Sequence, residues 1–132
     1  MNIRFVEEIV SDSFGLWISA LFSAVCSWNP ELSFCQQKDA FFSVIEYLVA
    51  NGKIKFIAPG ADCYVTSDNP HPRFSIKDEE CHWALDTSQI VAYLKDRWPD
   101  EVSSANEEAL TVYFYKMPGI IWVDDTGVLF AS

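Results

Sequence analysis

Hydrophobic and polar positions follow a helical period through residues 34–49, where apolar side chains recur at spacings of three and four. The apolar stripe covers more than one face, so the pattern predicts a helix that lies beneath other elements. Ser33 and Gln36 have the spacing of a capping box at its start, and Asn51-Gly52 supplies the residues that commonly end a helix. Residues 53–57 then alternate as a strand does.

Two further helices are expected before this one. Residues 3–10 form the first prediction, and Ser11-Asp12-Ser13 should break it and cap the next. Residues 14–28 form the second, with an apolar face opposite serines spaced four apart. This apolar run follows acidic residues and is shorter than a membrane span, so we expect neither a secretion signal nor a transmembrane helix.

The second half of the chain predicts short strands around one inserted helix. Asp86 and Gln89 have N-capping spacing, and the helix should extend to about Trp98, before Pro99. Asp124 to Gly127 should form the turn of a hairpin. The expected strands are residues 63–65 (as the partner of 54–57), 74–76, 81–84, 110–115, 120–123 and 128–131. This order predicts one α+β domain over residues 1–132, with N-terminal helices packed on a mainly antiparallel sheet and one further helix inserted between strands.

The charge is strongly acidic and uneven. Nineteen acidic and nine basic residues give a net charge of −10. Residues 1–60 hold six acids and four bases, a net −2, whereas residues 61–132 hold thirteen acids and five bases, a net −8. Direct binding to nucleic acid or to an anionic membrane surface is not expected, because lysine and arginine read both. The acidity serves solubility alone, or the second half offers a surface to a cationic partner.

Four cysteines and two histidines are the candidates for metal or thiol chemistry. Cys63, His71, Cys81 and His82 are chemically suitable zinc ligands, but their spacing contains no C-x2-C pair. A Cys–His nucleophile pair is the other alternative, although nothing local activates either thiol. The favoured interpretation is that these thiols, with those of Cys26 and Cys35, are reduced and structural in a cytoplasmic protein.

Other catalytic signatures are weak. Asp125-Thr126-Gly127 copies the short motif of aspartic proteases, but only five residues follow it and a protease half needs a long segment there. We therefore favour a hairpin turn. There is no glycine-rich phosphate loop, G-x-S-x-G elbow or H-E-x-x-H motif. The sequence gives no support for an enzyme, and no cofactor or metal is expected.

Acidic side chains gather in expected loops and turns, and this density predicts a surface that grips a basic partner such as the nucleic-acid groove of a nuclease. Calcium-loop spacing is missing. Trp83, Trp98, Tyr113 and Trp122 could anchor such an interface, although core positions are the favoured interpretation for each. The expected partner-binding residues are Asp78, Glu79, Glu80, Asp100, Glu101, Glu107, Glu108, Asp124 and Asp125.

Several long segments of the sequence resemble those of a known family. GKIKFIAPGADCY, DNPHPRF, the pair His82-Trp83, IVAYLKDRWP and LTVYFYKMPGIIWVDDTG resemble a group of small acidic bacterial proteins known as a domain of unknown function. They lie within residues 41–132, about two thirds of the chain. The family offers no catalytic motif to transfer. The resemblance implies a context of contact-dependent growth inhibition and polymorphic-toxin loci, where small cytoplasmic proteins neutralise a cognate toxin domain.

The sequence therefore leads to one main functional hypothesis. The chain is expected to be a non-enzymatic binding protein, an immunity protein that blocks a toxin's active site through an acidic surface. The first alternative is a housekeeping or regulatory binding module with no toxin partner. The second is a small Cys/His metal protein or enzyme.

Overall fold

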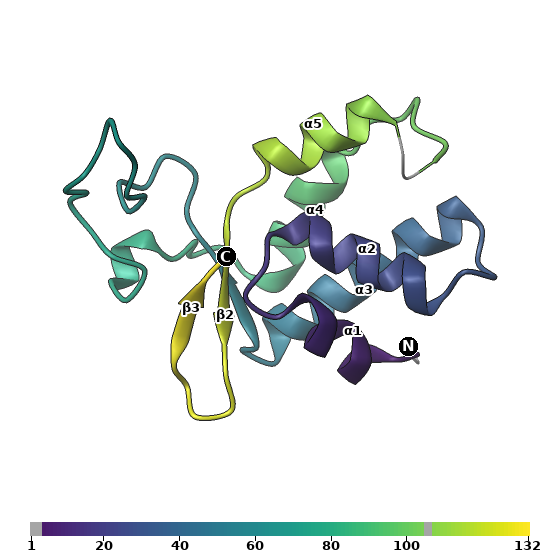
Figure 1. Cartoon of the computed structure of the whole chain (residues 1–132), viewed down its shortest axis with the longest axis horizontal. Helices are drawn as coiled ribbons and strands as arrows, with labels where there is room; N and C mark the ends of the chain where they lie inside the picture. The colour runs from purple at the N-terminus through teal and green to yellow at the C-terminus, as the bar shows by residue number, and fades with distance from the viewer. Residues whose placement is uncertain (1–3, 105–106) are drawn as a thin grey trace.

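The computed structural model describes residues 4–104 and 107–132, and within them the chain is α+β (Figure 1). This confirms the expected fold class: N-terminal helices, a three-stranded antiparallel sheet, and helices between the strands. The elements in chain order are α1 (Val6–Ser13), α2 (Ile18–Trp28), α3 (Phe34–Ala50), β1 (Ile54–Phe56), the 3₁₀ helix η1 (Glu79–Cys81), α4 (Thr87–Asp96), α5 (Glu108–Lys116), β2 (Ile120–Val123) and β3 (Leu129–Ala131).

Both expected capping boxes are present. The Ser33 hydroxyl accepts from the Gln36 N–H, and the Gln36 side chain accepts from the Ser33 N–H, at the start of α3. Asp86 and Gln89 make the same reciprocal pair at the start of α4. Gly52, just after α3, has a φ of 68°, a conformation that glycine adopts without strain. Local sequence thus sets the boundaries of these two helices.

The first two helices begin later than expected. The break placed at residues 11–13 lies inside α1, where the Ser13 hydroxyl donates to the Ile9 carbonyl at 2.7 Å. The chain turns instead at Gly15, whose φ is 81°, and α2 starts after Trp17. The expected start of the first helix at Ile3 lies outside the described residues.

The sheet has the order β1-β2-β3, with both pairs antiparallel. The expected hairpin of β2 and β3 is confirmed, and Gly127 in its turn has a φ of 86°. The expected pairing of residues 63–65 with β1 is wrong: β2 pairs with one edge of β1, and residues 81–83 bond to the chain at the other edge. The reason is burial: Ile120, Ile121 and Trp122 are fully buried, whereas Val65 is 74% exposed.

The expected strands at 74–76 and 81–84 are also wrong. Residues 58–84 form a long connection that contains η1 and only one bridge to the sheet, between Ile57 and His82. The polar side chains of this segment hold turns. The Asp62 carboxylate, for example, accepts from the Asn69 amide and from the Arg73 N–H. Short alternating runs therefore gave a false strand signal here.

The largest error concerns residues 110–115, which were expected to be a strand and form most of α5. Leu110, Val112 and Phe114 alternate, but the buried residues are Leu110, Tyr113 and Phe114, at helical spacing. Val112 is 44% exposed, although a strand would have placed it inward. Met117, also buried, extends the same helical stripe by one more turn.

Two hydrophobic clusters lie on opposite faces of the sheet. One face, with Ile54, Phe56 and Trp122, joins the main core under the helices. The other face, with Ile121, packs against residues of the 58–84 connection, including Cys63 and Cys81. In Figure 1 the helices gather on one side of the sheet and this connection extends on the other. The sheet is thus a middle layer.

An aromatic cluster joins the helices within the main core. The Trp98 ring packs against Phe22, Phe41, Phe42 and Tyr113, with ring centroids 5.2–6.3 Å apart. Through these contacts α2, α3, α5 and the end of α4 pack around the same aromatic cluster. None of the described helices is both long enough and apolar enough to cross a membrane.

Candidate functional site

The nine acidic residues expected to bind a partner occupy three separate parts of the molecule (Figure 1). Asp78, Glu79 and Glu80 belong to η1 and its N-terminal flank in the 58–84 connection. Asp124 and Asp125 lie in the hairpin turn between β2 and β3. The other four lie where α4 leads into α5: Asp100, Glu101, Glu107 and Glu108. The fold does not unite all nine on one surface.

Three of these carboxylates, those of Asp124, Glu107 and Asp78, accept hydrogen bonds within local turns. Asp124 accepts from the Thr126 hydroxyl at 2.7 Å and from the Val128 N–H at 2.9 Å, and these bonds hold its pKa below the ordinary value. The Glu107 carboxylate accepts from the N–H groups of Ser103 and Ser104, which likewise lower its pKa.

The third, Asp78, accepts from the Ser75 N–H at 2.7 Å. A fourth acid, Asp125, lies 3.6 Å from the Lys53 ammonium in an exposed ion pair. These roles account for four of the nine residues by local structure. Glu79, Glu80, Asp100, Glu101 and Glu108 are exposed, and no side-chain hydrogen bond or ion pair is found for them among the described residues.

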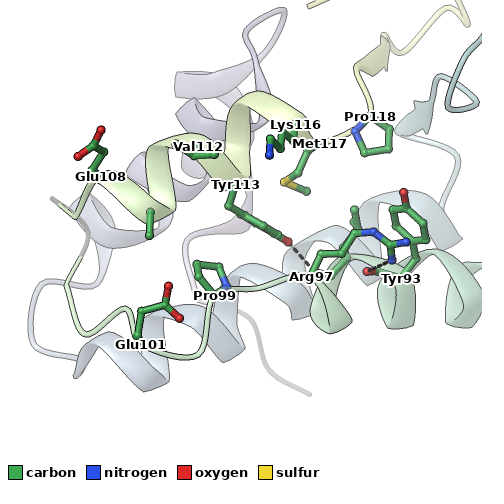
Figure 2. Close-up of a pocket in the computed structure, with 12 residues that line it drawn as sticks. Tyr93, Arg97, Pro99, Glu101, Glu108, Val112, Tyr113, Lys116, Met117 and Pro118 are labelled. Carbon is green, nitrogen blue, oxygen red and sulfur yellow. Dashed lines mark hydrogen bonds between the residues drawn. The ribbon is translucent and has the colours of Figure 1, made fainter.

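Two of those exposed acids, Glu101 and Glu108, line a groove between α4 and α5 (Figure 2). Its volume is about 620 Å³, in the range of peptide- and ligand-sized clefts. The residues that line it come from α4, the connector and α5 with its C-terminal flank: Tyr93, Leu94, Arg97, Pro99, Glu101, Glu108, Ala109, Val112, Tyr113, Lys116, Met117 and Pro118.

The wall of the groove is fixed by a buried hydrogen bond between its two helices. The Tyr113 hydroxyl of α5 donates to the Leu94 carbonyl of α4 at 2.6 Å. Burial raises the pKa of this phenol, so it stays protonated and keeps donating. Behind it, the Tyr113 ring packs on Trp98 with centroids 5.2 Å apart. The groove is therefore built on the aromatic core.

Among the charged side chains of the groove, that of Arg97 is held by stacking and by a hydrogen bond. Its guanidinium carbon lies 3.4 Å from the Tyr93 ring centroid, and its Nη1 donates to the Tyr93 carbonyl at 3.3 Å. Figure 2 shows the side chain lying back along α4 beside that ring. A weak ion pair with Asp96, at 3.9 Å, is exposed on both sides. The stacking orders the side chain while leaving guanidinium donors for another acceptor.

Charge is distributed unequally along the groove. Glu108 begins α5 and Lys116 ends it, so the two side chains lie at opposite ends of that helix. Glu101, in the connector, is at the Glu108 end, whereas Arg97 turns back toward Tyr93, away from the connector (Figure 2). Between the charged ends the lining is mainly apolar, with Ala109, Val112 and Met117 from α5. The groove is acidic at one end and basic at the other.

Sequence reasoning identified the acidic end and missed the basic one. Arg97 lies near the end of the helix predicted to extend to about Trp98, and the structure places it at the C-cap of α4. Lys116 drew no attention because its segment was expected to be a strand. The signal that could have found it is the helical spacing of Leu110, Tyr113 and Met117, which places the lysine at the end of a helix.

The expected aromatic anchors are mostly core residues, as favoured. Trp98, Tyr113 and Trp122 are buried, and only Trp83 is half-buried. The Trp122 indole N–H donates to the Leu16 carbonyl at 2.9 Å. An aromatic residue that was not considered, Tyr115, is 84% exposed on α5.

Cys63 and Cys81 lie in the hydrophobic cluster on the far face of the sheet from the helices (Figure 1). Among residues 4–104 and 107–132, no three His, Cys, Asp or Glu side chains come together as metal ligands. Cys81 is fully buried, and burial raises the pKa of Cys63 to about 11. The His82 Nε2 lies 2.7 Å from the Ile76 carbonyl and helps to hold the connection. Both thiols are buried in the hydrophobic cluster behind the sheet, and burial disfavours the thiolate form that a nucleophile needs.

Two other cavities offer less to a charged partner. A cavity of about 960 Å³ between α2 and α5 has no charged residue in its lining, which includes Ser19, Ser23 and Thr111. A third, of about 570 Å³, lies beside the hairpin turn and contains the Lys53–Asp125 pair. The third cavity also has an exposed acid, Glu7, but its one cation is paired with Asp125. The α4–α5 groove differs in having two acids without a side-chain partner among the described residues and an arginine ordered by ring stacking.

Comparison with known proteins supports the fold and adds no activity. No protein-family model and no curated protein matches this chain. Among solved structures, it is similar to an uncharacterized protein conserved in bacteria, from Neisseria meningitidis. The similarity has a TM-score of 0.65 and 16% sequence identity, and covers 96% of this chain and 85% of the other. The two chains share a fold, and this likeness carries no link to immunity proteins or growth-inhibition loci.

Proposed function

We propose that this chain is a non-enzymatic binding protein whose α4–α5 end holds a partner with a basic surface. The observation that carries the proposal is the placement of Glu101 and Glu108, exposed and unpaired within the described residues, beside the apolar floor of the groove. Acids that face solvent beside an apolar floor combine charge complementarity with a dry contact area, the two features of a protein interface.

The more specific form of this proposal is an immunity protein. In that role the chain would cover the active site of a bacterial toxin domain, such as a nuclease, whose substrate groove is basic. The net charge of −10 supports it, because an acidic surface speeds association with a basic one and competes with an anionic substrate. The family resemblance of residues 41–132 suggests the same context. No cofactor is needed for inhibition by occlusion.

Co-expression with the product of the neighbouring gene tests this function. We expect the two proteins to co-purify, and the isolated partner, tested as a nuclease on plasmid DNA, to lose activity when this chain is added. The variant E101K/E108K should bind at least tenfold more weakly, mainly through a slower association rate. Glu46→Lys, which reverses an exposed glutamate on α3, is the matched control and should leave binding unchanged.

Salt dependence gives a second measure. The affinity of the wild-type chain should fall as salt rises from 50 to about 500 mM, and that of E101K/E108K should fall less. A complex that forms equally well with both proteins at all salt concentrations would exclude the acidic end as the binding surface. A neighbour that neither binds nor is inhibited would exclude the immunity role and favour a binding module with another partner.

A further inference from the structure

The α4–α5 groove carries charges of both signs, although the chain as a whole is acidic. Glu101 and Glu108 define its acidic end, and Arg97 and Lys116 its basic end. A partner surface that is merely positive would be repelled at the basic end. The groove is therefore complementary to a ligand that itself carries a cation and an anion.

The separation of the two ends limits the size of that ligand. Glu108 and Lys116 are eight residues apart on α5, which corresponds to about 12 Å at a rise of ~1.5 Å per residue. An extended peptide advances by ~3.3 Å per residue, so about four residues would span this distance. An extended segment of this length fits a groove of about 620 Å³.

The basic end is suited to a carboxylate. Stacking on Tyr93 and one bond to the Tyr93 carbonyl order the Arg97 side chain, so less entropy is lost when it binds. The guanidinium keeps donors in the fork geometry that matches a carboxylate. Lys116 is exposed, and none of the ion pairs among the described residues includes it. Two cations thus line this end of the groove (Figure 2).

The middle of the groove is suited to apolar side chains. Val112 is 44% exposed in the middle of α5, where a soluble helix ordinarily carries a polar residue. Met117 adds a flexible thioether, and Pro99 and Pro118 also line the groove. An apolar side chain placed over Val112 would remove this surface from water.

We propose that the α4–α5 groove binds an extended peptide segment of about five residues, with a basic side chain held by Glu101 and Glu108, apolar residues over Val112, and a carboxylate held by Arg97 and Lys116. This inference rests on the proposed binding function and specifies the kind of partner segment that the groove accepts. The acids steer the partner, and the carboxylate fixes its direction and register.

A short synthetic peptide provides the direct test with the full chain. The probe is an acetylated pentapeptide with arginine first, then three apolar residues, and a leucine with a free terminal carboxylate. Binding is measured by isothermal titration calorimetry. Two matched peptides differ only in charge: one has citrulline in place of arginine, and the other ends in an amide. We expect each change to weaken binding roughly tenfold, as the loss of one charge-assisted contact does.

Protein variants assign each end of the peptide. Lys116→Gln should weaken binding of the acid peptide roughly tenfold and leave binding of the amide peptide unaffected. The reason is that Lys116 pairs with the terminal carboxylate, which the amide peptide lacks. Glu108→Gln should weaken the arginine peptide and leave the citrulline peptide unaffected. Lys55→Gln and Glu46→Gln, at exposed positions on β1 and α3, are the matched controls and should change nothing.

Three results would overturn the inference. They are no binding of any peptide at millimolar concentration, equal affinity for the acid and amide peptides, or a loss of affinity on Lys116→Gln that is as large for the amide peptide as for the acid peptide. The proposed function can fail separately. If the gene neighbour binds through Glu101 and Glu108 while the peptides do not bind, the inference is wrong and the proposed function stands. If the peptides bind as expected and no basic protein partner is inhibited, the immunity role is wrong and the binding function stands.

Discussion

The hairpin turn and the α4–α5 groove both contain two of the expected partner-binding acids, but the two regions use them differently. At the turn, Asp124 accepts from three groups of its own loop and Asp125 pairs with Lys53. At the groove, Glu101 and Glu108 face a cavity and make no such contacts within the described residues. The sequence does not distinguish the two regions, because in each the carboxylates lie near one another in or beside an expected loop.

The comparison shows that acidic density alone does not identify a binding surface. A carboxylate that satisfies backbone N–H groups contributes to the fold, because those donors would otherwise need water. A carboxylate that satisfies none keeps its charge available for a partner. The regions should therefore respond differently to substitution. In the turn, Asp124 should affect stability, and the groove acids should affect binding.

The strongest perturbation should come from the core beneath the groove. Trp98→Ala removes a buried ring that packs on Phe22, Phe41, Phe42 and Tyr113. We expect the free energy of unfolding in urea to fall by ~3–5 kcal/mol, through lost contacts and a cavity. Val128→Ala, at a 49% exposed position near the hairpin turn, is the control and should change it by less than about 0.5 kcal/mol. Equal effects would mean that Trp98 is not a core residue.

A smaller loss should follow when the hydrogen bond between α4 and α5 is removed. Tyr113→Phe deletes the hydroxyl that donates to the Leu94 carbonyl and leaves that buried acceptor without its partner. We expect a loss of ~1–2 kcal/mol in the free energy of unfolding at neutral pH. Thr111→Val, at an exposed α5 position, is the control. An unchanged value would show that the groove wall does not depend on this bond.

The same variant makes a prediction for alkaline pH. Burial raises the pKa of Tyr113 in the folded state, so the folded protein holds this proton more tightly than the unfolded chain does. Its contribution is complete below the unfolded value of about 10 and is lost as pH rises above it. Burial also raises the pKa values of Cys26 and Cys63 to about 11, and these thiols act in the same direction. Tyr113→Phe should therefore lose less stability than wild type between about pH 10 and 11.

The parts of the fold that the sequence predicted are those with strong local chemistry. The capping boxes at Ser33 and Asp86 fix the starts of α3 and α4, and the Asp124–Gly127 turn fixes the hairpin. These features depend on residues within a few positions of one another, so a single sequence contains the whole signal.

The parts that it did not predict depend on tertiary contacts. The period of residues 110–115 fits both a strand and a helix, and the choice is made by the core that receives Leu110, Tyr113 and Phe114. The partner of β1 comes from more than sixty residues later in the chain, at Ile120–Trp122. The groove follows from both: without α5 there is no wall opposite α4, and Arg97 and Lys116 cannot be brought to one site.

At the hairpin turn, loss of a carboxylate should reduce stability more modestly. Asp124→Ala removes the acceptor of the Thr126 and Val128 bonds and should lower the melting temperature at pH 7, measured by circular dichroism. The pKa of Asp124 is lowered in the folded state, so its contribution is present above the unfolded value of about 3.9. It is lost as pH falls through the folded value, and the difference from wild type should disappear there. The Asp125 carboxylate forms an exposed ion pair with Lys53, so Asp125→Ala should have a melting temperature close to that of wild type.

The groove acids should have the smallest effect on stability. Glu101→Gln and Glu108→Gln remove charge while keeping shape, and at these exposed positions the free energy of unfolding should change by less than about 0.5 kcal/mol. Their effect should appear in the association rate with a basic partner, measured by stopped-flow fluorescence at low salt, because that rate depends on the field around the groove. Asp124→Ala should show the reverse result, a lower melting temperature with an association rate close to wild type. If instead Glu101→Gln and Glu108→Gln lower the melting temperature as Asp124→Ala does, the groove acids are structural, and the contrast between the two regions does not hold.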